Sequence, residues 1–327
     1  MKNILILGGG GMVGQKLVTR LRTEGLEGDT NLDITLFDMA FQPEAADGVN
    51  CVTGNLTDPA MLSKLAALKP DIIFHLAAIV SGEAETNFDK GWDINMMPMW
   101  NLLSALKTEH IASQGEYVPR LVFTSSIAVF GPPFPDKIGD EFLSAPQTSY
   151  GAQKSICETL VTDFSRKGFI DGISLRLPTI CVRPGKANLA ASSFFSGIIR
   201  EPLNGQVALL PVADTVRHWH ASPRTAAAFL THAAAMNTDL LENRRALNLP
   251  GVSCTVAEQI EALRVVAGQS AVDLIVPKHD AAVAKIVSGW PRNFAPERAL
   301  SLGFTAETDF EQIIRTYIAD DLNPTDT

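Results

Sequence analysis

Short apolar runs alternate with stretches of helical periodicity through the first half of the chain. The first run, Ile4–Leu7, has four consecutive apolar residues, which is typical of a parallel strand buried on both faces. Glycines follow it directly, and a helical pattern then extends over Gln15–Thr23. Similar patterns predict further strands at Ile34–Phe37, Val49–Thr53, Asp71–Leu76, Leu121–Thr124 and Gly172–Leu177.

Helical periodicity separates these strands. Long helical stretches cover Asn87–Ser113 and Ser149–Lys167, and Asp58 before Pro59 has the chemistry of a helix start. Strands that alternate with helices predict an α/β fold, here a Rossmann-type doubly wound parallel sheet covered by helices on both faces.

Beyond Pro178 the alternation weakens, and prolines and glycines divide the chain into short pieces. We therefore expect a Rossmann domain over residues 1–178 and a smaller carboxyl-terminal substrate lobe over most of 179–327, with some segments returning to the Rossmann core. Its expected helices are Ser222–Met236, Val256–Val266 and Asp309–Ala319, and its expected strands are Ala246–Leu249 and Val272–Val276.

The glycine-rich turn after the first strand has the composition of a phosphate cradle. Gly8, Gly11 and Gly14 spell GxxGxxG, and Gly9, Gly11 and Gly14 spell GxGxxG, so spacing alone does not choose between the two templates. Residues without a β-carbon let backbone N–H groups approach a diphosphate, and a helix amino terminus adds partial positive charge. Taken alone, the pattern also suits an ordinary strand-to-helix turn.

Asp38 follows the second strand, at the distance where a carboxylate binds the adenosine ribose. A carboxylate there accepts hydrogen bonds from the ribose diol and repels a 2′-phosphate. No Arg directly follows Asp38. The expected cofactor is therefore NAD rather than NADP.

Composition excludes several other classes of protein. The net charge is −9 over 327 residues with no basic run, which argues against a nucleic-acid partner and against electrostatic docking to a membrane. The amino terminus has no signal-peptide pattern and no stretch is long and apolar enough for a membrane span, so we expect a cytoplasmic protein. The cysteines form no CxxC pair and stand far apart, at Cys51, Cys157, Cys181 and Cys254.

Histidine positions do not indicate a metal site. His218 and His220 have H-x-H spacing, but no third ligand accompanies them, so we expect no metal. His75, inside a predicted strand, is interpreted as a packed core residue rather than a catalyst.

Tyr150 and Lys154 stand four residues apart on a predicted helix, so their side chains share one face. A phenol with a pKa of about 10 is a poor base at neutral pH, but a nearby ammonium favours the phenolate. Ser125 and Ser126 follow another strand and reach the same edge of the sheet, and Asn95 is a candidate buried polar residue.

Together these motifs resemble the extended branch of the short-chain dehydrogenase/reductase family, which contains NAD-dependent epimerases, dehydratases and dehydrogenases. The resemblance implies that Tyr150 is the general base, assisted by Ser126, Lys154 and Asn95, with Ser125 the less favoured register for the serine. It also implies cofactor contacts from Gly8, Gly11, Met12, Val13, Gly14, Asp38, Asn55, Leu56, Leu76, Ala77, Ala78, Asn95, Tyr150, Lys154, Leu177 and Thr179.

Some positions depart from the sugar-nucleotide members of this branch. Thr179 stands where they commonly have Asn, and Arg224 stands where they have an acid. The segments Ala77–Glu85, Arg217–Arg224 and Asn248–Gly251 resemble instead the dehydrogenases that oxidise carbon 2 of a small sugar acid such as D-erythronate. The residues expected to bind such a substrate are Ser81, Ser126, Tyr150, Thr179, Arg183, Arg217 and Arg224.

A substrate carboxylate needs a cationic partner, and Arg217 is the first choice, followed by Arg183 and Arg224.

The leading hypothesis is thus NAD-dependent oxidation of the 2-hydroxyl of an aldonate. Two alternatives stay open: a nucleotide-sugar epimerase or dehydratase with retained NAD, and a non-catalytic NAD-sensing protein. The sequence does not choose the aldonate or its stereoisomer. The resemblance further implies a homodimer formed through the helices at Asn87–Ser113 and Tyr150–Lys167.

Overall fold

The computed structural model describes residues 1–42, 48–185 and 191–322. The chain forms two compact units, each assembled from separate segments. Unit 1 consists of Met1–Val129, Pro146–Arg176 and Ala227–Leu247, and unit 2 of Phe130–Ala145, Leu177–Ala226 and Asn248–Thr327.

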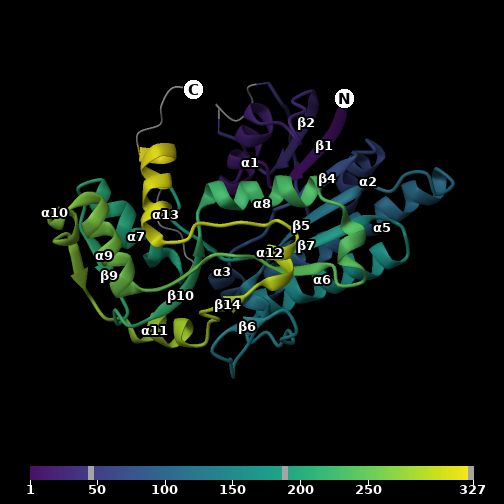
Figure 1. Cartoon of the computed structure of the whole chain (residues 1–327). Helices are drawn as coiled ribbons and strands as arrows, with labels where there is room; N and C mark the ends of the chain where they lie inside the picture. The colour runs from purple at the N-terminus through teal and green to yellow at the C-terminus, as the bar shows by residue number, and fades with distance from the viewer. Residues whose placement is uncertain (43–47, 186–190, 323–327) are drawn as a thin grey trace. The chain divides into compact units, whose positions relative to one another are not determined.

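A seven-stranded sheet is the frame of unit 1, and its strands lie side by side in Figure 1. The strand order is β11-β7-β5-β4-β1-β2-β3, so the direction of winding reverses between β1 and β4. The pairs that β1 forms with β2 and with β4 are both parallel. The predicted doubly wound α/β fold is confirmed. The strands are β1 (Lys2–Leu7), β2 (Leu32–Asp38), β3 (Asn50–Thr53), β4 (Ile72–His75), β5 (Arg120–Ser126), β7 (Asp171–Leu177) and β11 (Ala246–Asn248).

Helices cover both faces of this sheet. Leu5 and Leu7 of β1 belong to a buried apolar cluster with residues of α2 (Pro59–Ala67), α5 (Met97–Ala112) and α6 (Ser149–Arg166). Side chains alternate along a strand, so the equally buried Ile4 and Ile6 point to the opposite face. There α1 (Met12–Thr23) lies beside α8 (Pro223–Ala235), and Arg20 donates a hydrogen bond to Thr231. The continuous apolar run of β1 reflects this burial on two sides.

The prediction of one helix over Asn87–Ser113 was wrong. The structure has α4 (Phe88–Asn95) and α5, with a break at Met96. Pro98 in the first turn of α5 has no backbone N–H to bond the preceding turn, which explains the break. A further short helix, α3 (Ser81–Thr86), precedes α4. The predicted cap was right, since the Asp58 side chain accepts a hydrogen bond from the Ala60 N–H.

Unit 2 has its own core and small sheets of two or three strands. The three-stranded sheet has the order β12-β10-β8, and β13 pairs with β9 and β14 with β6. The strand predicted at Val272–Val276 was misplaced, because a helix ends at Val272 and the strand starts at Ile275. The strands are β6 (Ile138–Gly139), β8 (Thr179–Ile180), β9 (Ala208–Leu210), β10 (Arg217–Ala221), β12 (Val252–Thr255), β13 (Ile275–Pro277) and β14 (Phe294–Ala295).

The helices of unit 2 are mostly short. They are α7 (Ser193–Leu203), α9 (Val256–Ala267), α10 (Gln269–Val272), α11 (Ala281–Ser288), α12 (Glu297–Ser301) and α13 (Phe310–Tyr317), with a helical turn η4 at Ile318–Leu322. Unit 1 also contains the 3₁₀ turns η2 (Ile127–Val129) and η3 (Thr238–Leu241). Among the helices that the structure describes, none is both long and apolar enough to cross a membrane.

A polar network joins the third segment of unit 1, Ala227–Leu247, to the seven-stranded sheet. The Asp171 carboxylate at the start of β7 pairs with Arg120 and with Arg245, each at 2.7 Å, and accepts a hydrogen bond from Thr238. Burial raises the pKa of Asp171, but these hydrogen bonds and positive charges outweigh it, so that its pKa lies below the usual 3.8. The ionised carboxylate therefore stabilises the folded state.

We predict that Asp171→Asn lowers the free energy of unfolding by roughly 1–3 kcal/mol at pH 7, because buried donors lose a charged acceptor. The folded-state pKa is lowered, so the contribution is present above pH 4 or so and is lost as the pH falls through the folded-state pKa. Urea unfolding at several pH values measures this difference.

The matched control is Asp163→Asn, which removes an exposed pair with Arg166 at 2.7 Å and is expected to change stability by less than about 0.5 kcal/mol. Equal losses in the two variants, or a loss at Asp171 that does not shrink in acid, would contradict the role of the network.

Candidate active site

The glycine turn connects β1 to α1 by an unusually close approach of backbone segments. Gly8 has a φ of +88°, and a β-carbon on it would lie 2.6 Å from the Ala77 nitrogen. A β-carbon on Gly14 would lie 2.5 Å from the Gly8 carbonyl oxygen. Gly11 is the N-cap of α1 and contributes no capping side chain. Both outer glycines of GxxGxxG are thus required by packing, and the turn presents an uncapped helix amino terminus. Met12 and Val13 form the first turn of that helix.

A pocket of about 240 Å³ opens beside this turn. Most of the cofactor residues predicted in unit 1 line it, from the ends of four neighbouring strands, β4, β1, β2 and β3. Sequence reasoning missed several lining residues; all of them lie next to a strand end that the pattern located, except Ile94, which is on α4. The lining residues are Gly8, Gly11, Phe37, Asp38, Met39, Gly54, Asn55, Leu56, Thr57, Leu76, Ala77, Ala78, Ile79 and Ile94.

Asp38 and Asn55 occupy the pocket with their side chains already oriented. Asp38 accepts hydrogen bonds from the N–H groups of Gly10 at 2.9 Å and Met39 at 2.7 Å. Asn55 accepts one from the Thr57 N–H at 3.0 Å, which leaves its amide nitrogen available to a ligand. Such bonds fix the side chains before any ligand arrives.

Asn95 is buried, as predicted, with an exposed fraction of 2%. Its side-chain oxygen accepts a hydrogen bond from the Ile79 N–H at 2.8 Å, and its nitrogen donates to Gln153 at 2.8 Å. Because Ile79 lines the pocket, Asn95 ties the pocket wall to the helix that contains Tyr150 and Lys154.

Ser126, Tyr150 and Lys154 come together where β5 ends and α6 begins. The Tyr150 phenol forms a hydrogen bond with the side chain of Ser126. The Lys154 Nζ lies 5.5 Å from the centroid of the Tyr150 ring and donates to the Thr124 carbonyl at 2.8 Å. The hydroxyl of Ser125 instead donates to Glu158 at 2.5 Å. The two adjacent serines therefore have different partners, and Ser126, the one favoured from the sequence, is the one that contacts Tyr150.

Burial determines the titration of this group. It raises the pKa of Tyr150 to about 12, which the hydrogen bond to Ser126 opposes. Burial also lowers the pKa of Lys154 to about 8, opposed by Cys157 and Glu158. The pKa of Tyr150 is thus raised, not lowered as expected, because desolvation of the buried phenol is the largest effect.

Two residues that sequence reasoning missed support this group. Glu158, 5% exposed, lies one helical turn after Lys154 and pairs with Arg176 at 2.7 Å while it accepts from Ser125. Gln153 is fully buried beside Asn95. The i,i+4 spacing from Lys154 to Glu158 was the available signal, since it places both on one helix face.

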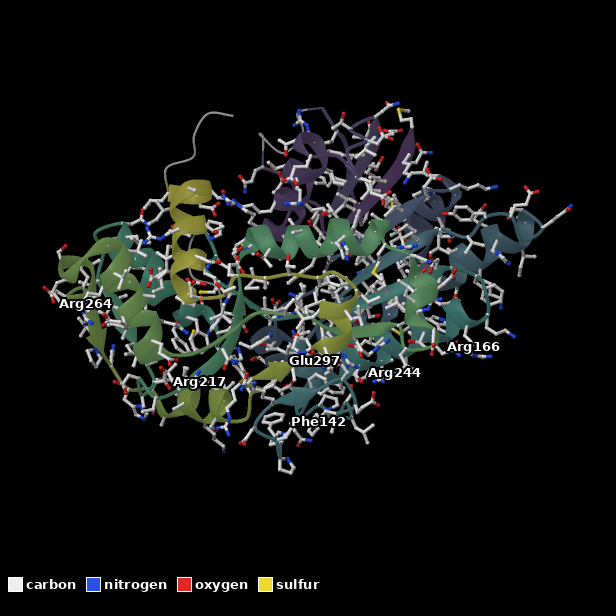
Figure 2. All side chains as sticks on the ribbon, viewed as in Figure 1. Phe142, Arg166, Arg217, Arg244, Arg264 and Glu297 are labelled. Carbon is white, nitrogen blue, oxygen red and sulfur yellow. The ribbon has the colours of Figure 1, made fainter. Side chains whose placement is uncertain are left out.

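The remaining predicted residues occupy other positions. Ser81 begins α3 in unit 1, and Leu177 ends β7. In unit 2, the Thr179 hydroxyl lies 2.6 Å from His218 Nε2. Arg217, on β10 (Figure 2), pairs with Glu258 at 3.1 Å and donates to the Ser253 carbonyl, and Arg224 pairs with Asp320. Two of the three candidate arginines thus pair with carboxylates, and the third, Arg183, donates to the Ser192 hydroxyl.

Three histidines, at positions 75, 218 and 220, are buried. Burial lowers the pKa of His75 to about 3, with the Lys154 charge acting in the same direction, and burial also lowers the pKa of His218 to about 3. His220 is fully buried next to Gln259, whose amide lies 2.9 Å from its Nε2. No group of three or more His, Cys, Asp or Glu side chains arranged to hold a metal occurs in the described part of the chain.

Comparison with known proteins agrees with this geometry. A family model described as "NAD dependent epimerase/dehydratase family" matches residues 4–249, which include the glycine turn and the Ser126, Tyr150 and Lys154 group. The chain belongs to the NAD dependent epimerase/dehydratase family. The resemblance inferred from the motifs is confirmed.

Curated members of the family are similar over nearly the whole chain. A D-erythronate dehydrogenase of Cupriavidus necator is 44% identical over 97% of this chain and 98% of its own length. A D-erythronate dehydrogenase of Haemophilus influenzae is 39% identical over 98% and 99%. A solved structure, named as the nucleoside-diphosphate-sugar epimerase from Agrobacterium tumefaciens, is 52% identical, with a TM-score of 0.94 over 98% of this chain and 94% of that one.

We predict that Gly14→Ala weakens NAD binding at least about tenfold, because the added methyl group overlaps the Gly8 carbonyl and forces the turn apart. Calorimetric titration with NAD measures the effect. Gly139→Ala is the matched control, since a β-carbon there meets nothing within 4 Å. NAD affinity that is the same in both variants would show that the turn does not hold the diphosphate.

Proposed function

We propose that this protein is an NAD-dependent dehydrogenase that oxidises the 2-hydroxyl of a small sugar acid, D-erythronate or a close aldonate, to the 2-oxo acid. The hydrogen bond between Tyr150 and Ser126, with Lys154 beneath the phenol, is the observation that carries this proposal. The two D-erythronate dehydrogenases that resemble the chain over nearly its full length support the substrate class.

The residues of the glycine turn and its pocket fit NAD. Glycines at positions 8 and 14 let the turn pack closely, the uncapped amino terminus of α1 at Gly11 suits a diphosphate, and Asp38 suits an unphosphorylated ribose. Asn55 and Leu56 would hold the adenine, and Leu76, Ala77 and Ala78 the wall next to it. Bound NAD⁺ supplies a hydride acceptor and a positive ring.

Each residue of the catalytic group has a separate task in the proposed reaction. Ser126 holds the reacting hydroxyl, and Tyr150 removes its proton. Lys154 supplies positive charge under the phenolate and binds the nicotinamide ribose. Asn95 fixes the backbone at Ile79 and, through Gln153, the helix of the base. Ser81, Leu177 and Thr179 are assigned to the substrate and nicotinamide side of the site. The phenol with a pKa of about 12 needs both positive charges to act near neutral pH.

A second candidate is a nucleotide-sugar epimerase or dehydratase that recycles NAD. The similar Agrobacterium tumefaciens structure, named as a nucleoside-diphosphate-sugar epimerase, favours it. Thr179 and Arg224 disfavour it, since they replace the Asn and acid of the sugar-nucleotide enzymes. Net formation of NADH separates the two, because an epimerase returns its hydride. A protein that binds NAD but turns over neither substrate class would be the sensor alternative.

We predict that wild type forms NADH from NAD⁺ and D-erythronate, and that Tyr150→Phe lowers turnover by about 10²- to 10⁴-fold while NAD affinity is retained. Absorbance at 340 nm measures it across aldonates of four to six carbons and both hands. Tyr117→Phe is the control, because that hydroxyl donates to the Pro70 carbonyl away from the site. Near-normal turnover in Tyr150→Phe would eliminate Tyr150 as the base.

We predict a pH-dependent effect of Lys154→Met. Removal of the ammonium raises the tyrosine pKa, so the acidic limb of kcat/KM moves to higher pH. The ratio of wild-type to variant activity is greatest below pH 8 and falls above it, because Lys154, with a pKa of about 8, loses its own charge there. Lys167→Met, at the exposed end of α6, is the control. A ratio independent of pH would contradict an electrostatic role.

A further inference from the structure

Gln153 lies between Tyr150 and Lys154 in the sequence of α6 and is fully buried, which is unusual for a glutamine. Its side-chain oxygen accepts a hydrogen bond from the Asn95 amide at 2.8 Å. Its side-chain nitrogen is buried as well and has no hydrogen-bond partner in the part of the chain that the structure describes. A buried donor without an acceptor destabilises a fold, and a methionine would fill the same space without one. The glutamine is therefore explained by what its oxygen does.

The oxygen of Gln153 fixes the direction of the Asn95 amide. Asn95 Oδ1 accepts from the Ile79 N–H at 2.8 Å, and Asn95 Nδ2 donates to the Ile79 carbonyl at 3.4 Å as well as to Gln153. If the Asn95 amide were reversed, its nitrogen would face the Ile79 N–H and its oxygen would face the Gln153 oxygen. An acceptor at Gln153 is thus compatible only with the orientation in which the Ile79 N–H has its partner.

Ile79 belongs to the wall of the pocket beside the glycine turn. Of the residues that precede it, Leu76 and Ala77 donate their N–H groups to the Leu7 carbonyl of β1, so the sheet holds them. Ile79 is half-buried, and among the described residues the Asn95 oxygen is the one acceptor of its N–H group. The pocket wall at Ile79 therefore depends on a side chain and not on the sheet.

Helix α4 confines the amide of Gln153. A β-carbon on Gly91 would lie 2.6 Å from the Gln153 nitrogen and 3.2 Å from the β-carbon of Ala84. Glycine at this position leaves the space that the Gln153 amide occupies. The attachment of α6 to the sheet does not depend on this amide, because Lys154 donates separately to the Thr124 carbonyl.

We infer that Gln153 is a positioning residue for the cofactor, which acts through Asn95 to hold the pocket wall at Ile79. This inference rests on the proposed function, which supplies NAD(H) as the ligand. Gln153 thereby serves dinucleotide binding and not the chemical step, because the ammonium of Lys154 keeps its own bond to β5. Loss of the Gln153 oxygen weakens cofactor binding and leaves turnover at saturating cofactor unchanged.

The first variant is Gln153→Met, which keeps the length of the side chain but has no acceptor. We expect the dissociation constant of NADH, measured calorimetrically, and KM for NAD⁺ to rise about three- to tenfold, as for the loss of one buried hydrogen bond. With D-erythronate as substrate, kcat stays within about twofold of wild type. Hydrogen–deuterium exchange becomes faster in a peptide that contains Leu76–Val80, because the Ile79 N–H loses its fixed acceptor.

Gly91→Ala is the second variant, for the case in which Gln153→Met does not fold. Its methyl group displaces the end of the Gln153 side chain, and alanine favours a helix more than glycine does. NADH binding weakens at least about twofold, and exchange at Ile79 again becomes faster. Gln259→Met is the matched control, since Gln259 is also fully buried but contacts His220. It leaves NADH affinity and exchange at Ile79 unchanged.

A double-mutant cycle tests whether the effect passes through Asn95. In a chain that already contains Asn95→Ala, Gln153→Met has no further effect on NADH affinity, because the bond it would break is absent. Losses that add in the double variant would show that Gln153 acts by another route and would overturn the inference.

Two further results would also overturn it. One is NADH affinity and Ile79 exchange equal to wild type in Gln153→Met, or in Gly91→Ala should Gln153→Met not fold. The other is a fall in kcat as large as the loss of NADH affinity, which indicates a general disturbance of α6.

The binding and exchange measurements need no substrate, so they separate this inference from the proposed function. If they change as expected but wild type forms no NADH from D-erythronate, the proposed function is wrong and the role of Gln153 stands. If wild type oxidises D-erythronate while the variants bind NADH as wild type does, the proposed function stands and the role of Gln153 is wrong. If wild type does not bind NADH, both are wrong.

Discussion

Buried polar bonds between α6 and β5 hold the catalytic group in place. Lys154 donates to the Thr124 carbonyl, and Glu158, one turn further along the helix, accepts from Ser125 and pairs with Arg176. These bonds are largely buried, and an unpaired partner costs more there than in water. The helix therefore cannot slide along the strand without leaving buried charges unpaired. Ser126 and Tyr150, carried by these two elements, meet because the strand and the helix are locked in register.

Much of unit 1 could be predicted from the sequence because the signals are local. A strand buried on both faces gives a continuous apolar run, and a turn that a β-carbon would block requires glycine, so Ile4–Leu7 and Gly8 to Gly14 indicate their own structure. The pocket residues Asp38 and Asn55 follow strands that the pattern located. Tyr150 and Lys154 share a helix face by spacing alone.

Other features were harder to predict for two reasons: one local signal was weak beside its surroundings, and several contacts join residues far apart in the sequence. The break at Met96 is caused by a single proline, Pro98. The helical pattern on both sides of this proline is strong, so the break was not predicted. The choice between Ser125 and Ser126 depends on Glu158, 33 residues further along. Arg217 pairs with Glu258 and Arg224 with Asp320, which lie 41 and 96 residues further along the chain. A local sequence pattern does not show which arginine a distant carboxylate will pair with.

The route of the chain has a consequence for how the protein is made. Residues Ala227–Leu247 belong to unit 1, and β11 supplies the outermost strand next to β7. Arg120 also donates to the carbonyls of Ala233 and Met236, near the end of α8. A nascent polypeptide that has left the ribosome only as far as residue 178 therefore has an open sheet edge and an arginine without its carbonyl partners. During translation, the unit that contains Tyr150 is completed only after the intervening part of unit 2 has been synthesised.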